Sequence, residues 1–176
     1  MPHKILKAAC LLPLILLLCQ CDVLKPTAPS PYASSVRMAF TPMSRAAMDR
    51  DKDNFTVVAY YFGDPVPQAV KKADAVGRFI LGEERFGWTT NTKRVHLDGK
   101  FDTSLLPQIR GDVQVLITAY SVTPIGASDD LIHCRSWIGS VKMAQERPPL
   151  IACELENNDK DSADDLVVAD EASSSQ

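Results

Sequence analysis

Short segments rich in β-branched and aromatic residues, separated by turn residues, constrain this chain more than any other feature. The strongest is Phe55–Phe62, in which seven of eight residues are apolar or aromatic. Such a run predicts a central strand that is covered on both faces. A second strong segment, Asp112–Val122, alternates between two faces. The residues that share its more apolar face are Val113, Val115, Ile117 and Ala119.

Weaker strand patterns occur elsewhere along the chain. They cover residues 36–40, 76–81, 88–97, 131–143 and 150–155. Pro42, Gly63-Asp64-Pro65, Gly82 and Asp98-Gly99 punctuate these segments, and no convincing amphipathic helix lies between them. About seven short strands with turn signals predict an all-β protein, an antiparallel β-sandwich of immunoglobulin-like or transthyretin-like type. A barrel is the alternative.

The length and the charge distribution divide the chain into parts. Its 176 residues suit one domain once the terminal segments are set aside. We expect a signal or anchor segment at 1–21, a Pro-rich tether at 22–35, a sandwich at 36–156 and a disordered acidic tail at 157–176. Eight acids against Lys160 give residues 154–176 a net charge of −7. Residues 8–153 carry only +2, so no basic nucleic-acid-binding face is expected.

The N-terminus has the pattern of an export signal. His3, Lys4 and Lys7 precede an apolar block from Ala8 to Leu18. A cationic segment before 7–15 apolar residues directs export, and a bilayer span would need roughly 20 apolar residues. Prolines then recur through Lys25–Ser35, where they favour an extended tether over helix or strand.

Two cysteines close the apolar block, and their setting resembles the signal of bacterial lipoproteins. In that family a Leu three residues before a Cys precedes cleavage, and the Cys becomes the acylated first residue. Leu16 stands in this relation to Cys19, and Leu18 to Cys21. The resemblance implies lipidation of Cys19 or Cys21 and attachment to a bacterial membrane facing the periplasm. An ordinary signal cleaved near Thr27-Ala28 and an uncleaved anchor are the alternatives.

A second resemblance covers less than a fifth of the chain. Asn54–Leu81 contains an aromatic strand, then Phe62-Gly63-Asp64-Pro65-Val66 and Gly77-Arg78-Phe79. This run looks like a segment of small, uncharacterised bacterial β-sandwich lipoproteins. It implies the same fold and carries over no catalytic residues.

The cysteine pattern fits an oxidising compartment. Cys10 lies in the apolar block and would leave with a cleaved signal. With one of Cys19 and Cys21 acylated, Cys134 and Cys153 are left as a structural disulfide. The alternative is that both are free and buried.

Residues that could carry chemistry are few, and no catalytic motif, metal site or cofactor site is visible. His96-Leu97-Asp98 permits a histidine–carboxylate pair on one strand face, although a strand-end histidine beside a turn acid is the simpler interpretation. His133 and Cys134 are adjacent and would point to opposite strand faces. Asp49–Asn54 spaces acids as a calcium loop does, but Asn54 stands where such a loop needs glycine. A solvated loop is therefore favoured there.

These observations favour an exported, lipid-anchored envelope protein that acts as a non-catalytic binding or structural module. We expect the membrane and an envelope protein as its partners, without nucleic acid. An envelope enzyme, or a binder of small ligands or carbohydrates that uses the sandwich loops, is the alternative function.

Overall fold

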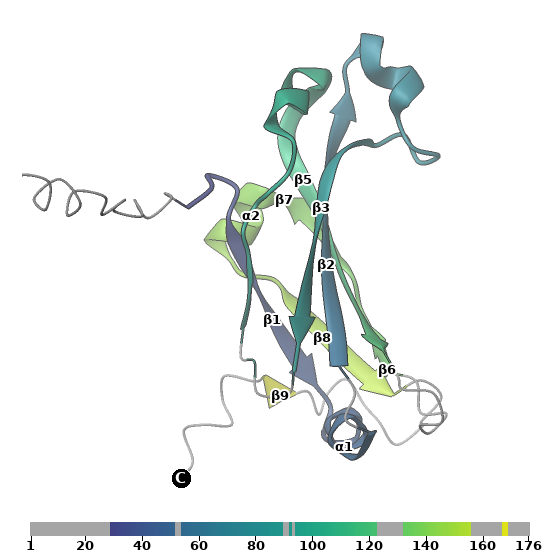
Figure 1. The fold of residues 1–176 in the computed structure, drawn as a ribbon, viewed down its shortest axis with the longest axis vertical. Coiled ribbons are helices and arrows are strands. Elements are labelled where there is room, and N and C mark those ends of the chain that lie inside the picture. Colours follow the sequence, from purple (N-terminus) through teal and green to yellow (C-terminus); the bar gives the residue numbers. More distant parts are fainter. Residues whose placement is uncertain are drawn as a thin grey trace, which may run out of the picture.

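The computed structural model describes residues 29–51, 54–89, 92, 94–122, 132–155 and 167–168. Strands dominate this part of the chain, with two short α-helices and two 3-10 helices between them (Figure 1). The strands are β1 (Ser34–Phe40), β2 (Asn54–Pro65), β3 (Phe79–Trp88), β4 (Arg94–Leu97), β5 (Ile109–Val122), β6 (Ile132–Cys134), β7 (Trp137–Ser140), β8 (Leu150–Leu155) and β9 (Val167–Val168). The helices are α1 (Pro42–Asp51), η1 (Pro67–Lys72), η2 (Thr103–Gln108) and α2 (Val141–Glu146).

The strands form two sheets. Sheet A has the order β4-β1-β8-β6, and β9 also pairs with β1; sheet B has the order β3-β2-β5-β7. The inward-facing side chains of both sheets form one core, which confirms the prediction of an all-β sandwich. The described residues contain nine strands, where the sequence predicted about seven.

Aromatic side chains join the two sheets at one end of the core. Phe40 of sheet A stacks on Trp88 of sheet B, with ring centroids 4.7 Å apart. Phe55 packs edge-on against Phe40 at 5.5 Å. All three side chains are at most 1% exposed. Stacked and edge-on geometries suit the aromatic quadrupole, so this cluster stabilises the sheet-to-sheet contact.

The two strongest sequence patterns form the centre of sheet B. Phe55–Phe62 lies within β2, which pairs with β3 on one side and β5 on the other. The predicted inward face of β5 is correct, because Val113, Val115, Ile117 and Ala119 are all buried.

One pairing differs from the predicted antiparallel arrangement. β1 and β8 run parallel, from Arg37 opposite Leu150 to Phe40 opposite Cys153. The reason is the course of the chain before β8. α2 returns the chain to the end of the sandwich where β1 begins, and the side-chain amide of Gln145 donates to the carbonyl oxygens of Pro31 and Ala33.

The strand predicted at 76–81 lies further along the chain than expected. β3 begins at Phe79 and continues through Gly82 to Trp88. A Cβ atom at Gly82 would lie 2.9 Å from the Cβ of Phe101. Gly82 therefore leaves room for a neighbouring segment and does not end the strand.

The alternating run at 131–143 does not form one strand. β6 belongs to sheet A, and after Arg135 and Ser136 the chain crosses to sheet B as β7. The run then turns into α2, where the hydroxyl of Ser140 accepts a hydrogen bond from the Met143 amide at 3.1 Å. A period-two pattern is the same in either sheet, so it does not reveal such a crossing.

α1 covers ten residues, Pro42–Asp51, between two predicted strands where the sequence showed no convincing amphipathic helix. Thr41 caps its start, because its hydroxyl accepts from the Ser44 amide at 3.1 Å. Pro42 occupies the first helical position, where a missing N–H costs nothing. The Thr-Pro pair therefore starts a helix as well as ending β1.

The predicted terminal segments are only partly within the described residues. Ser34 and Ser35, assigned to the tether, belong to β1. Of the predicted tail at 157–176, the structure describes only β9, which pairs with Ala39 and Phe40 of β1.

Candidate functional site

Cys134 and Cys153 are joined by a disulfide, with an S–S distance of 2.06 Å. They lie directly opposite each other on the antiparallel pair β6 and β8. Arg135 follows β6 and pairs with Glu154 of β8 at 3.5 Å. These links hold the three-residue strand β6 in sheet A just before the chain leaves it. Cys19 and Cys21, the candidate lipidation residues, lie outside the described residues.

The two histidines of the body lie on opposite edge strands of sheet A. His96 is in β4 and His133 is in β6, and two further strands separate them. At roughly 4.8 Å per strand, about 14 Å separates the two edge strands. Asp98, for which the sequence permitted a pair with His96, forms an ion pair with Lys100. The Lys100 ammonium and its hydrogen bond lower the pKa of the Asp98 carboxyl.

Two acids of the suggested calcium run lie in a helix and not in a loop. Asp49 and Asp51 belong to α1, and residues 52–53 lie outside the described part. The favoured prediction of a solvated loop is also wrong for Asp49–Asp51, because α1 continues to Asp51. Among the described residues, no group of three His, Cys, Asp or Glu side chains is placed to hold a metal ion.

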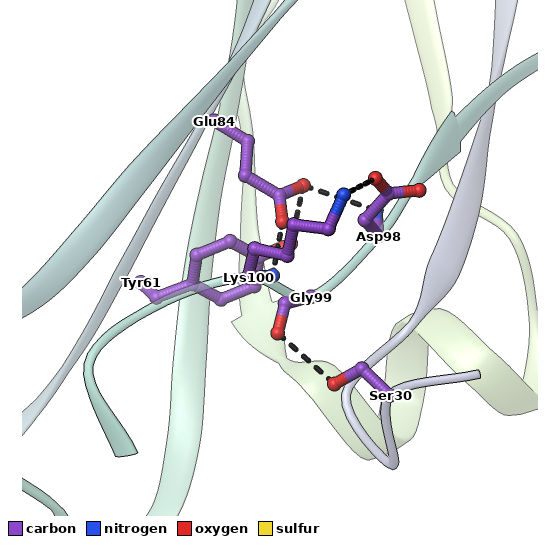
Figure 2. Close-up of polar contacts among 6 residues, drawn as sticks. All are labelled: Ser30, Tyr61, Glu84, Asp98, Gly99 and Lys100. Atoms are coloured by element: carbon purple, nitrogen blue, oxygen red, sulfur yellow. Dashed lines mark hydrogen bonds and ion pairs between the residues drawn. The ribbon is translucent and has the colours of Figure 1, made fainter. Parts of the chain in front are cut away.

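A buried carboxylate, which the sequence did not indicate, connects the two sheets at the outer edge of β3. Glu84 faces the core from this edge strand and is only 8% exposed. Its carboxylate accepts from the Asp98 amide at 3.0 Å and from the Lys100 amide (Figure 2). The loop that follows β4 of sheet A is thereby bound to β3 of sheet B. An inward-pointing charge also protects an edge strand from pairing with other chains.

The same loop contacts the first residues that the structure describes. The Ser30 hydroxyl donates to the Gly99 carbonyl oxygen at 3.0 Å (Figure 2). Gly99 has φ of +69°, and a Cβ atom there would lie 2.4 Å from the carbonyl carbon of Tyr32. Only glycine fits this combination of left-handed backbone and close approach. Glu84, the loop and the entering chain therefore form one structural unit.

Tyr61 completes this polar group from the core side. Its hydroxyl lies 3.5 Å from the Glu84 carboxylate. Burial raises the pKa of Tyr61 well above its ordinary value of 10, and the negative charge of Glu84 raises it further. A phenol that resists ionisation is a poor general base at neutral pH. We therefore interpret the group as a structural link between the sheets.

An open groove lies beside the place where the chain changes sheets. The chain leaves sheet A after Arg135, so the first residues of β8 have no β6 residue opposite them. Trp137 begins β7 next to this gap, and its indole covers Gly139, whose added Cβ would lie 2.6 Å from the ring. α2 contacts β1 and β7 (Figure 1). A groove of about 400 Å³ results.

The groove combines apolar surface with positive charge. Its lining residues are Arg37, Trp137, Met143, Arg147, Pro148, Pro149 and Leu150. Met143 is 56% exposed and Leu150 is 39% exposed, so both offer apolar contact to another molecule. Two guanidinium groups and no carboxylate among the lining residues suit a partner with an anionic group next to an apolar one.

Sequence reasoning missed the groove because its residues come from three separate segments. Arg37 and Trp137 lie in two different predicted strands, and Arg147–Pro149 lies between predicted strands. The Arg-Pro-Pro-Leu sequence was the available signal, since two consecutive prolines keep a helix from continuing and leave the surrounding side chains at the surface.

No family model, curated protein or solved structure matches this chain. Across the residues that the structure describes, no helix has both the length and the apolar character needed to cross a membrane.

Proposed function

We propose that this protein is exported and lipid-anchored in the bacterial cell envelope, faces the periplasm and acts as a non-catalytic binding module. The groove beside the sheet crossing is the single observation that carries the binding role. Its lining combines exposed apolar side chains with two arginines. The candidate histidines, by contrast, lie on separate edge strands.

The ligand that suits this groove is an extended peptide segment of an envelope protein. Trp137 and Met143 offer flat and adaptable apolar surface, as binding sites for peptides often do. Arg37 and Arg147 approach from two different elements, so an acidic side chain could contact either guanidinium. Burial of the apolar contacts would strengthen these charge interactions.

The anchor is supported by the lipoprotein-like signal and by the Pro-rich segment after it. Acylation of Cys19 or Cys21 would place the body on a tether that ends near Ser30, where the chain joins the Gly99 loop. An immunoglobulin-like or transthyretin-like arrangement is the finer fold that we propose for the sandwich. Both types present loops at the ends of the sheets for interaction.

Capture of partners from detergent-solubilised envelope tests the binding role. The full chain carrying Met143→Glu and Arg147→Glu should lose a partner that the unchanged chain retains stoichiometrically. Arg110→Glu is the matched control, because Arg110 is exposed at the start of β5, away from the groove lining. Identical capture by the groove variant and the unchanged chain would contradict the proposal.

Mass spectrometry of the mature N-terminus tests the anchor separately. We expect an acylated Cys19 or Cys21 as the first residue. An unmodified terminus beyond Asp22 would refute the anchor and leave the binding role intact.

An enzymatic or small-ligand function is the alternative. Loss of an envelope activity on replacing His96 or His133, with folding unchanged, would favour the enzyme. Quenching of Trp137 fluorescence by a sugar would favour the small-ligand binder.

A further inference from the structure

The crossing between β6 and β7 leaves part of one strand edge without a neighbour. β6 pairs with residues 153–155 of β8, and after Arg135 the chain passes to sheet B. The Arg135 amide extends this contact by donating to the Ala152 carbonyl oxygen at 2.8 Å. None of the strands that the structure describes pairs with this edge of β8 at Leu150. Figure 1 shows β8 running from α2 towards β6, so the open edge lies at the α2 end.

The main-chain groups of Leu150 face this open edge. On the other side of β8 lies the parallel strand β1, with Arg37 opposite Leu150. The Arg37 amide donates to the Pro149 carbonyl oxygen at 2.9 Å, so Pro149 faces β1. Successive residues of a strand direct their main-chain groups to opposite sides, and the Leu150 N–H and C=O therefore point away from β1. Leu150 also lines the groove, so a molecule bound there can reach these groups.

The two faces of a strand added at this edge would meet different chemistry. Leu150 and Arg37 lie opposite each other on the outer face of sheet A, since the next residue of β8, Ile151, is fully buried. A peptide residue opposite Leu150 would share that outer face. At roughly 4.8 Å per strand it would lie about 10 Å from β1, a distance that an arginine and an acidic side chain together can span. Its neighbours in the peptide would point inward, where Trp137 packs against the core.

We propose that the groove binds an extended peptide by strand addition: an acidic residue between two apolar residues pairs antiparallel with Leu150, in the place that β6 leaves in sheet A. In an antiparallel pair one residue can exchange both hydrogen bonds with its partner, which suits an edge that offers the groups of one residue. The carboxylate of the peptide meets Arg37, and the flanking apolar side chains meet Trp137. Strand addition is a common mode of peptide recognition.

This inference rests on the proposed binding function of the groove and specifies the chemistry of its ligand. Pro148 and Pro149 limit the added pairing to a short segment, because proline has no N–H to donate. Specificity must then come from the alternation of side chains in the peptide. An acid on the outer face and apolar groups on the inner face match the arginine and the indole of the groove.

Binding of end-blocked peptides to the full chain, measured by isothermal titration calorimetry, tests the proposal. The probe is acetyl-Ser-Val-Asp-Val-Ser-amide, whose valines favour an extended backbone. N-methylation of the aspartate nitrogen removes the N–H that would donate to the Leu150 carbonyl oxygen, and the Kd should rise about tenfold or more. N-methylation of the following valine is the matched control, because the N–H of that residue points away from β8. Asparagine in place of the aspartate should also weaken binding, because it removes the charge that meets Arg37.

Variants of the chain test the same contact from the other side. Leu150→Pro removes the N–H that faces the open edge and should raise the Kd of the unmodified probe about tenfold or more. Leu150→Val keeps this N–H and should bind the probe much as the unchanged chain does. Because the Leu150 N–H does not bond to β1, we expect both variants to fold, and thermal unfolding checks this.

Equal effects of the two N-methyl groups would overturn strand addition, and so would a failure of the unmodified probe to bind. Capture from solubilised envelope separates this inference from the proposed function. A partner lost with Met143→Glu and Arg147→Glu but retained by Leu150→Pro would refute strand addition and leave the groove as a binding site. A partner retained by both variants would refute the binding function itself.

Discussion

The two sheets of this sandwich are built in different ways. Sheet B rests on β2, β3 and β5, strands of 12, 10 and 14 residues that pair with one another over most of their length. Sheet A is assembled from β1 and several strands of six residues or fewer, drawn from distant parts of the chain. The disulfide joins two strands within sheet A, and the Glu84 contacts and the aromatic cluster attach sheet A to sheet B. Sheet B therefore relies on continuous pairing, and sheet A relies on cross-links.

This difference explains where the groove arises. The long strands of sheet B pair over most of their length. Apart from the edges of the sheet, they therefore leave few unpaired main-chain groups and few irregular gaps. Short strands end within sheet A, and the groove lies where one of them, β6, stops. A sheet built from fragments is easier to interrupt, and each interruption exposes a surface that another segment can fill.

Removing the aromatic contact between the sheets should have the largest effect. Trp88→Ala deletes the ring that stacks on Phe40, and we expect a loss of about 3–5 kcal/mol in the free energy of unfolding. Chemical denaturation measures this loss in the free energy of unfolding. Trp88→Phe should cost less, because it keeps a ring and removes a buried indole N–H that has no hydrogen-bond partner. A loss below 1 kcal/mol for the alanine variant would show that the sheets are joined elsewhere.

Removing the disulfide should come next and should affect sheet A more than sheet B. Cys134→Ala with Cys153→Ala opens a link between residues 19 apart, and about 2–4 kcal/mol should be lost. Hydrogen exchange should show faster opening of β6 and β8 than of β2 and β5. Uniform opening of both sheets would mean that sheet A does not depend on this cross-link.

The smallest effect should be a pH dependence from the link between Tyr61 and Glu84. Burial and the nearby carboxylate raise the pKa of Tyr61 in the folded state. The contribution of Tyr61 to the free energy of unfolding is therefore complete below the unfolded pKa of about 10. It is lost as the pH rises further, at about 1.4 kcal/mol per pH unit. Tyr61→Phe should remove this slope from the free energy of unfolding between pH 10 and 11. Tyr120→Phe, an exposed control, should leave the slope in place.

The sequence predicted sheet B better than sheet A for a physical reason. Phe55–Phe62 and Asp112–Val122 are long enough for their patterns to identify a buried strand and its inward face. The run at 131–143 alternates just as clearly, yet it contains two strands from different sheets and the start of a helix. Alternation reports that one face is buried and says nothing about which sheet buries it.

The candidate site was predicted only in part. Cys134 and Cys153 were paired by elimination among five cysteines, and the structure brings them together as opposite residues of β6 and β8. Glu84 carried no signal, since Glu83-Glu84-Arg85 reads as a solvated surface. Its burial depends on a loop 14 to 16 residues further along the chain, and local patterns do not contain that contact.

By itself, the sequence determined the strand-rich character of the body, the inward face of β5 and the central position of β2, because each depends on residues close together in the chain. Only the tertiary structure decided the parallel pairing of β1 and β8, the crossing between the sheets and the burial of Glu84. Those features depend on which distant segments meet, and the free energy that selects them comes from burial and hydrogen bonds formed on folding.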